Sequence, residues 1–170
     1  MPVENRTMKK IGVKESVNTD QFTLRSAREE DAAAVTECVH NAFRHYIDRM
    51  GMKPGPMRMD YAQEIRDHEV WIVDSNDGSM AGVAVLCTTE EGFLLDVLAV
   101  EPRYQGKGVG KLLLEFSESE ALRHGYDSIY LFTHEKMTEN QSLYKKIGYV
   151  EYDRRVEHGL RRIYMRKQLK

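Results

Sequence analysis

The sequence predicts one α/β domain in which helices cover the faces of a mixed β-sheet. Two patterns indicate this: apolar residues alternate or run continuously in about seven short segments, and they recur at helical spacing in about four others. The two kinds of segment interleave along the chain, which is typical of α/β folds. At 170 residues, the chain is long enough to bury one hydrophobic core.

The first part of the chain is expected to form a tail, a strand and two helices. Residues 1–21 are polar and lack an apolar signal-peptide core, so we expect a loose N-terminal tail before a domain over residues 22–170. Alternation over 22–25 predicts the first strand. Apolar side chains recur every three or four residues from Val35 to Met50, as in one long amphipathic helix. Glycine and proline residues end it, and a short helix is expected over 59–66.

A β-meander is expected next. The segments 70–74 and 80–87 are apolar and β-branched, and a turn signal separates them. The segment 93–100 is a nearly continuous apolar run, which indicates a central strand that is buried on both faces. In the rest of the chain we expect helices over 109–124 and 139–147, and strands over 128–133, 149–155 and 160–166.

Charge and composition narrow the functional classes. The formal net charge of -2 gives no general attraction to nucleic acid or to an anionic membrane, and no stretch approaches the roughly 18 apolar residues of a membrane span. Cys38 and Cys87 lie far apart and outside any CxxC motif, which favours buried side chains in a reducing, cytoplasmic compartment. Residues 151–170 are locally basic and form either a charged edge hairpin or a rim that attracts a phosphorylated ligand. The sequence does not determine the oligomeric state, and a homodimer is compatible with it.

A glycine-rich loop joins the predicted central strand to the next helix. Backbone N–H groups at a helix N-terminus attract anions, and glycines let the backbone approach a phosphate closely. Lysines in the loop add positive charge. The segment therefore predicts a phosphate-binding cradle, with a tight turn as the alternative; it reads Val97-Leu98-Ala99-Val100-Glu101-Pro102-Arg103-Tyr104-Gln105-Gly106-Lys107-Gly108-Val109-Gly110-Lys111-Leu112.

Two common phosphate-binding motifs do not fit this loop. A P-loop requires Gly-x4-Gly-Lys-Ser/Thr, but Leu112 follows Lys111. A dinucleotide fingerprint requires Gly-x-Gly-x-x-Gly, but Lys111 stands where the third glycine belongs. The arrangement Gln105-x-x-Gly108-x-Gly110, directly after a strand ending Leu-Ala-Val-x-Pro, instead resembles the coenzyme A signature of the GNAT superfamily of N-acetyltransferases.

The resemblance covers Phe22 to about Lys167, because the order of elements also matches that fold. It implies a GNAT-like acyl-CoA N-acyltransferase fold with a mixed, mostly antiparallel sheet, and acetyl-CoA as co-substrate. Backbone N–H groups of the loop would hold the pyrophosphate, and the central strand would splay from its parallel neighbour to admit the pantetheine arm. The cofactor-binding residues implied in this way are Leu98, Ala99, Val100, Gln105, Gly106, Lys107, Gly108, Val109, Gly110, Lys111, Asn140 and Tyr144.

A second segment resembles the family motif Asn…Leu-Tyr-x-x-x-Gly-Phe/Tyr, with its tyrosine at Tyr144. The resemblance implies that the Tyr144 hydroxyl lies near the thioester sulfur and protonates the departing thiolate; a buried structural tyrosine is the alternative. The family asparagine lies seven residues before the tyrosine, where this chain has Met137. Asn140, on the same helix face as Tyr144, either contacts the pantetheine arm or has a capping or solvent-bonding role.

An amine acceptor must lose a proton before it attacks the thioester. Some members of the family use a glutamate on the strand after the loop, but that position is Phe132 here. Asp96 is the first candidate for the base or for a water anchor, because it is an acidic residue within an otherwise apolar strand. His134 is the second candidate, with a surface histidine as the alternative, and Glu91 is the third.

The resemblance also implies that the first two helices and their connection select the acceptor. The candidate substrate residues are Tyr46, Arg49, Asp60, Tyr61 and His134. Arg49 could hold a carboxylate and Asp60 an ammonium, with a surface role as the alternative for each. None of the six histidines belongs to an HExxH or similar motif, so no metal is expected.

We therefore expect direct acetyl transfer from acetyl-CoA to a primary amine, catalysed by Tyr144 and Asp96 in a ternary complex. A small-molecule acceptor is slightly favoured over a peptide or protein amine. The alternative is a non-catalytic acyl-CoA-binding or regulatory module, which would bind the cofactor but turn over no amine. Nucleic-acid binding ranks lower, because no basic surface with interleaved aromatic residues is evident outside the C-terminal hairpin.

Overall fold

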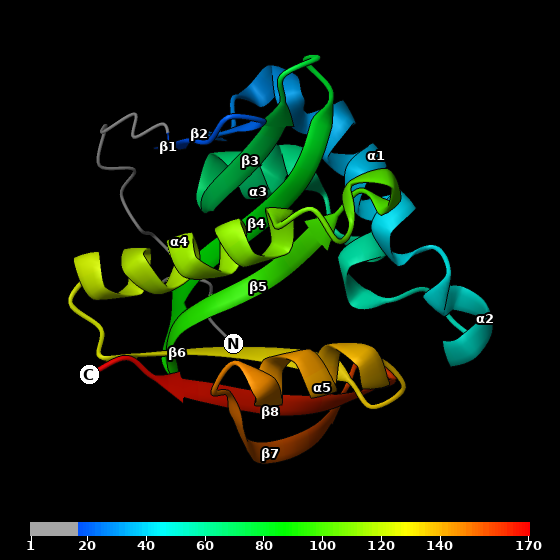
Figure 1. Ribbon diagram of the computed structural model, residues 1–170. Helices are drawn as coiled ribbons and strands as arrows, with labels where there is room; N and C mark the ends of the chain where they lie inside the picture. The colour runs from blue at the N-terminus through cyan, green and yellow to red at the C-terminus, as the bar shows by residue number, and fades with distance from the viewer. Residues whose placement is uncertain (1–16) are drawn as a thin grey trace.

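The computed structural model describes residues 17–170, which form an eight-stranded sheet with helices on both faces (Figure 1). Every strand pairing in this range is antiparallel except the parallel pair β5–β6, so the predicted mixed, mostly antiparallel sheet is confirmed. In spatial order the strands are β1 (Val17–Asn18), β2 (Phe22–Ser26), β3 (Glu69–Ser75), β4 (Met80–Thr89), β5 (Gly92–Val100), β6 (Ser128–His134), β8 (Leu160–Gln168) and β7 (Val150–Glu157).

The N-terminal boundary differs from the expected one. The first backbone pairing joins Val17 and Asn18 to β2, so a short strand lies within the stretch expected to be a tail. The rest of that predicted tail, residues 1–16, lies outside the described residues.

The described part of the chain has five α-helices. They are α1 (Ala32–Phe43), α2 (Tyr46–Met50), α3 (Tyr61–Asp67), α4 (Val109–Arg123) and α5 (Thr138–Lys146). Three short 3-10 helices accompany them, over Glu29–Asp31, Gly55–Arg58 and Pro102–Tyr104.

The prediction of one long helix from Val35 to Met50 is wrong, because the chain turns between α1 and α2. The N–H of Ile47 donates to the carbonyl of Arg44, three residues back rather than four, at 3.2 Å. This tighter turn redirects the chain while apolar spacing continues across it. Both Tyr46 and Met50 of α2 are buried as a result.

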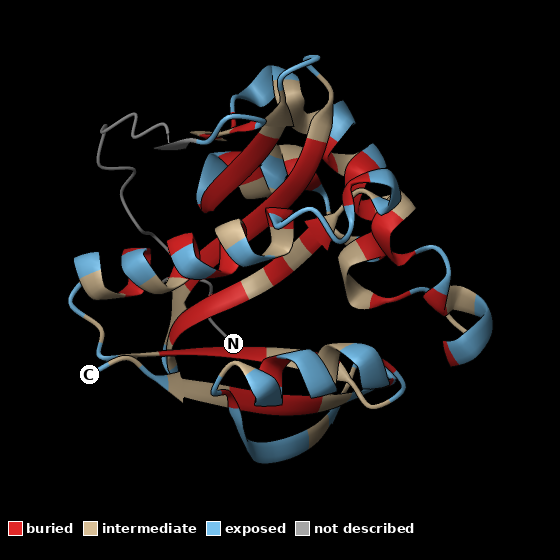
Figure 2. Ribbon diagram, viewed as in Figure 1, coloured by how far each residue is buried: buried red, intermediate tan, exposed pale blue. Residues whose placement is uncertain are grey.

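Two hydrophobic clusters lie on opposite faces of the sheet. On one face α4 packs through Val109, Leu113 and Phe116, and on the other face lie α1 and α3 with Val35 and Ile65. Figure 2 shows buried residues along both β4 and β5, which are the strands between these clusters. The expectation that the 93–100 strand is buried on both faces holds for most of its residues.

The close packing of α4 on β4 depends on Gly82. A Cβ atom at this position would lie 2.8 Å from Val109 Cγ1 and 3.1 Å from the carbonyl oxygen of Ala99. We expect Gly82→Ala to lower the free energy of unfolding by about 1–3 kcal/mol, because the first turn of α4 must move outward. Urea denaturation measures the change.

Gly110→Ala is the matched control for this packing. A Cβ atom there would make an ordinary contact, 3.6 Å from Val100 Cγ2, in the same first turn of α4. Because glycine costs about 1 kcal/mol relative to alanine inside a helix, this variant should be as stable as the wild type or more stable. Equal destabilisation by both substitutions would contradict the packing account.

Candidate active site

β5 and β6 separate soon after they pair. Within the described residues, the parallel pairing of β5 with β6 consists of one residue pair, Leu94 with Tyr130, near the start of β5. Beyond that pair β5 follows β4 and β6 follows β8, so the two strands diverge, as Figure 1 shows. The C-terminal part of β5 therefore presents an edge without a strand partner, next to the glycine-rich loop.

The loop after β5 presents a row of backbone N–H groups. None of the N–H groups from Gly106 to Lys111 has a hydrogen-bond acceptor among the described residues. Gly106 and Gly108 have φ of 77° and 87°, in the left-handed region that favours glycine. Gly108 caps α4, so the row of N–H groups coincides with the positive end of the helix dipole. This is an anion-binding arrangement.

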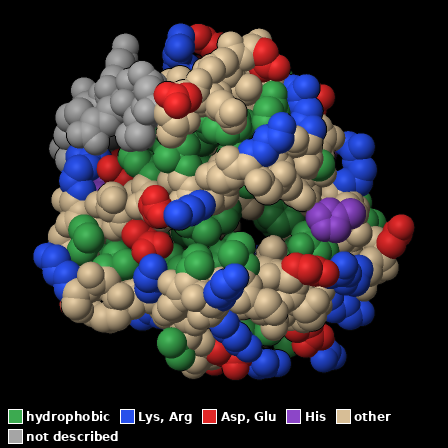
Figure 3. Space-filling view, in the orientation of Figure 1, with side chains coloured by type: hydrophobic (Ala, Val, Ile, Leu, Met, Phe, Trp, Pro, Cys, Tyr) green, Lys and Arg blue, Asp and Glu red, His purple; other side chains and the backbone are tan. Residues whose placement is uncertain are grey.

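A groove of about 950 Å³ begins at this loop and runs between α4, α5 and the α1–α2 turn. Figure 3 shows the same face of the molecule hollowed, with hydrophobic side chains in the hollow and both basic and acidic side chains around it. Many of the residues proposed from sequence line the groove: Tyr46, Arg49, Leu98, Val100, Gln105, Gly110, Lys111, Asn140 and Tyr144.

Five other residues proposed for the cofactor do not line the groove. The side chains of Ala99 and Val109 are buried in the core clusters, so only their main chains could take part in binding. Gly106, Lys107 and Gly108 form the loop at the end of the groove. The Nζ atom of Lys107 lies 5.7 Å from the centre of the Tyr104 ring.

Sequence reasoning missed much of the groove wall. Phe43, Leu114 and Ile147 supply apolar surface, and Lys146 and Lys167 supply positive charge. The apolar residues were missed because their helical spacing is the same for a groove wall as for a core. Nothing in the local sequence indicates that these segments meet.

A small cavity of about 60 Å³ continues the groove between the diverging strands. It shares Phe43, Leu98, Asn140 and Tyr144 with the groove. The Tyr144 hydroxyl has no hydrogen-bond partner among the described residues, and burial raises the pKa of this side chain. At neutral pH the hydroxyl therefore keeps its proton.

Asp96 lines the small cavity. It also lines a third cavity of about 580 Å³, together with Phe132 and Arg162. Burial raises the pKa of Tyr61, and the negative charge of Asp96 raises it further. Asp96 thus lines both the small cavity, which shares residues with the groove, and the third cavity.

The structure places some of the candidate substrate residues in the groove or the small cavity and others elsewhere. Tyr46 and Arg49 are in the groove, where Arg49 forms an ion pair with Glu139 at 2.7 Å. His134 lines the small cavity; its Nδ1 accepts the N–H of Lys136 at 3.1 Å, and burial lowers its pKa.

Asp60 and Tyr61 are not brought to the groove or to either smaller cavity. The Asp60 carboxylate accepts the N–H of Gln63 at 3.2 Å and so caps α3. Tyr61 is buried, and its hydroxyl donates to the carbonyl of Pro56 at 2.6 Å. Both side chains therefore support the fold around the α2–α3 connection.

Glu91, the third candidate base, is held by other side chains. It forms an ion pair with Arg155 and accepts the Tyr152 hydroxyl at 2.8 Å. The hydrogen bond from Arg155 lowers the pKa of Glu91. Other basic residues of the C-terminal hairpin are paired in the same way, which fits the charged edge hairpin; the pairs are Arg154–Glu151, Arg161–Glu135, Arg162–Glu157 and Lys167–Glu118.

Among residues 17–170, no helix combines the length and the hydrophobicity needed to cross a membrane. Cys38 and Cys87 are buried and form no disulfide.

Comparison with known proteins identifies a family. A family model described as an acetyltransferase (GNAT) domain matches residues 66–151, half of the chain. The match begins in α3 and includes the glycine-rich loop, Asp96 and Tyr144. No curated protein matches the chain.

Solved structures share the fold. An acetyltransferase of the GNAT family from Staphylococcus aureus is 17% identical, with a TM-score of 0.73 over 88% of this chain and 99% of that one. The PaiA N-acetyltransferase from Thermoplasma acidophilum, in complex with coenzyme A, is 20% identical, with a TM-score of 0.71 over 86% and 98%. The ribosomal-protein-S18-alanine N-acetyltransferase from Escherichia coli is 21% identical, with a TM-score of 0.69 over 87% and 94%.

Proposed function

Because this chain belongs to the GNAT acetyltransferase family, we propose that it transfers the acetyl group of acetyl-CoA to a primary amine. One observation carries the proposal: the N–H groups from Gly106 to Lys111 have no acceptor among residues 17–170, and this loop lies at the end of a groove that reaches Tyr144. A pyrophosphate would supply the missing acceptors at the N-terminus of α4. The unpaired edge of β5 would then bond the pantetheine arm.

Lysines line the groove beside the loop, and the phosphates of acetyl-CoA are anionic. Lys111 and Lys167 are paired with Glu115 and Glu118, so the backbone N–H groups supply the main attraction for the phosphates. The apolar walls of the groove suit the pantetheine arm. A bound thioester would reach the small cavity shared by Leu98, Asn140 and Tyr144.

The proposed reaction is a direct transfer within a ternary complex. The Asp96 carboxylate, alone or through a water, takes a proton from the acceptor ammonium. The amine nitrogen then bonds to the acetyl carbon, the carbon–sulfur bond breaks, and the Tyr144 hydroxyl donates its proton to the departing thiolate. The second proton, which the nitrogen loses as it becomes an amide, passes through water to the Tyr144 oxygen and restores the hydroxyl. Tyrosine has an ordinary pKa of about 10 and burial raises that of Tyr144, so the hydroxyl carries its proton at neutral pH when the thiolate forms.

The cavities favour a small-molecule acceptor. The 60 Å³ cavity has room for the amine end of a substrate, and the 580 Å³ cavity beyond Asp96 has room for a small body. The buried cysteines without a disulfide support a reducing, cytoplasmic location.

An amine panel tests the proposed function. The purified chain is mixed with acetyl-CoA and amines that range from small molecules to peptides, and free thiol is measured as coenzyme A is released. We expect at least one amine to give release above the hydrolysis rate. A chain that binds acetyl-CoA but turns over no member of the panel would instead be a non-catalytic acyl-CoA-binding module.

Replacing Asp96 tests the base. We expect Asp96→Asn to lower kcat/KM on the order of 10²-fold at pH 7 and to leave acetyl-CoA affinity unchanged. The loss should shrink as pH rises toward the pKa of the amine, about 10 for an alkyl amine, because the free base then forms in solution. Glu91→Gln is the control, since Glu91 is held by Arg155. A larger loss in the control would reject Asp96 as the base.

A further inference from the structure

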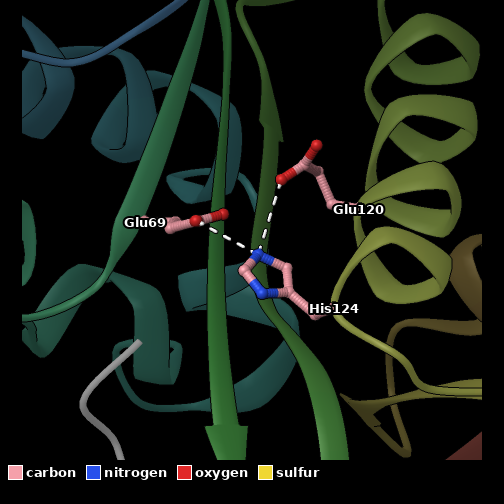
Figure 4. Close-up of side chains that lie close together, drawn as sticks. All are labelled: Glu69, Glu120 and His124. Carbon is pink, nitrogen blue, oxygen red and sulfur yellow. Dashed lines mark ion pairs between the residues drawn. The ribbon is translucent and has the colours of Figure 1, made fainter. Parts of the chain in front are cut away.

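Three titratable side chains converge on the α4 side of the sheet, outside the proposed active site. Glu69 comes from the start of β3, and Glu120 and His124 come from the end of α4, as Figure 4 shows. The spacing of four residues places Glu120 and His124 on one face of the helix. None of the three lines the groove or either smaller cavity.

The donor atoms lie at the spacing that a bound metal ion needs. His124 Nε2 is 3.3 Å from Glu69 Oε1 and 3.7 Å from Glu120 Oε2. One donor atom of each residue lies within 4.8 Å of the others. Since zinc binds imidazole and carboxylate donors at about 2.0–2.2 Å, tetrahedral ligands lie roughly 3.3–3.6 Å apart.

The cluster is buried and incompletely hydrogen-bonded. The side chains of Glu69 and Glu120 are 5% and 3% exposed. The Nε2 atom of His124 is buried and has no well-aligned hydrogen bond among the described residues, but it lies at ion-pair distance from both carboxylates, as the dashed lines in Figure 4 show. A buried carboxylate is costly unless its charge is compensated, and a cation between the three donors would add to the compensation that Arg123 already gives Glu120.

Neighbouring side chains fix the orientation of each donor. Trp71 Nε1 donates to Glu69 Oε2 at 3.3 Å, which leaves Oε1 toward the histidine. Arg123 donates to both oxygens of Glu120, at 2.9 and 2.7 Å. The Phe93 ring stacks on His124 with 5.7 Å between ring centres. Outer contacts of this kind orient metal ligands in proteins.

We propose that Glu69, Glu120 and His124 form a zinc-binding site between the end of α4 and the start of β3. One imidazole nitrogen and two carboxylate oxygens form a donor set that suits zinc, with water completing the coordination. His124 is 13% exposed, which gives the ion and the water a route from solvent. The expectation of no metal was based on local sequence motifs. Glu69 is distant in sequence from Glu120 and His124, and only the folded structure brings it beside them.

Zinc titration tests the site. The chain, without an affinity tag and stripped by a chelator, is titrated with Zn²⁺ alone in a calorimeter. We expect one equivalent to bind with micromolar or tighter Kd and to raise Tm. His124→Asn and Glu120→Gln should each weaken binding at least about 10-fold.

His68→Asn is the matched control, because His68 is also buried but is paired with one glutamate, Glu64. It should bind zinc as the wild type does. Absence of saturable binding to the wild type, or equal binding by the wild type and His124→Asn, would overturn the proposal. If the variants do not fold, anomalous scattering at the zinc edge decides on wild-type crystals: a peak between the three side chains supports the site, and no peak there rejects it.

Discussion

Gly108→Glu is expected to weaken acetyl-CoA binding at least about 100-fold, because it places a negative charge where the pyrophosphate would lie. Like charges brought together cost several kcal/mol, and about 1.4 kcal/mol corresponds to a factor of ten in Kd. A Cβ atom at Gly108 meets nothing within 4 Å, so the side chain itself has room. Calorimetric titration of acetyl-CoA measures the loss.

Gly125→Glu is the matched control for that variant. Gly125 lies just after α4, with φ of 85° against 87° for Gly108, and its Cβ would also meet nothing within 4 Å. The two substitutions therefore carry the same charge and similar backbone strain. Only the one at the loop should affect binding. Equal affinity of both variants for acetyl-CoA would place the pyrophosphate elsewhere.

Tyr144→Phe is expected to lower kcat on the order of 10²-fold while the Kd for acetyl-CoA stays within about twofold. The substitution removes the proton that the thiolate needs and keeps the ring that packs in the core. Steady-state kinetics and calorimetry separate the two effects. An equal loss in kcat and in affinity would assign Tyr144 to binding rather than to proton transfer.

Tyr149→Phe is the control for this second prediction. The two tyrosine rings lie edge to face with 5.7 Å between their centres, and the Tyr149 hydroxyl is buried with no hydrogen-bond partner in the described part of the chain. Tyr149 does not line the groove or the small cavity. Removing its hydroxyl should leave kcat unchanged. A similar loss in both variants would indicate a packing effect.

Local sequence predicted the elements that its own periodicity determines. All seven predicted strands are present, and the helix expected over 109–124 forms as α4 directly after the glycine loop. These predictions succeed because alternation and helical spacing reflect burial within one segment. The break between α1 and α2 was missed, because the apolar spacing continues through the turn at Arg44 and His45.

Contacts between distant segments were harder to predict. Asp60 and Tyr61 follow a proline-rich loop, and the sequence does not distinguish them from residues that face the groove. In the structure Asp60 caps α3 and Tyr61 is buried. Glu69 is far in sequence from Glu120 and His124, so no local motif indicates their cluster. Such placements depend on the register of β3 with β4 and on the packing of α4.

A crystal structure of the chain with coenzyme A is the most direct test of the proposed site. We expect pyrophosphate oxygens to accept hydrogen bonds from the backbone N–H groups of residues 106–111, and the sulfur to lie within hydrogen-bonding reach of the Tyr144 hydroxyl. Coenzyme A bound outside the groove, or bound with its sulfur away from Tyr144, would contradict the account.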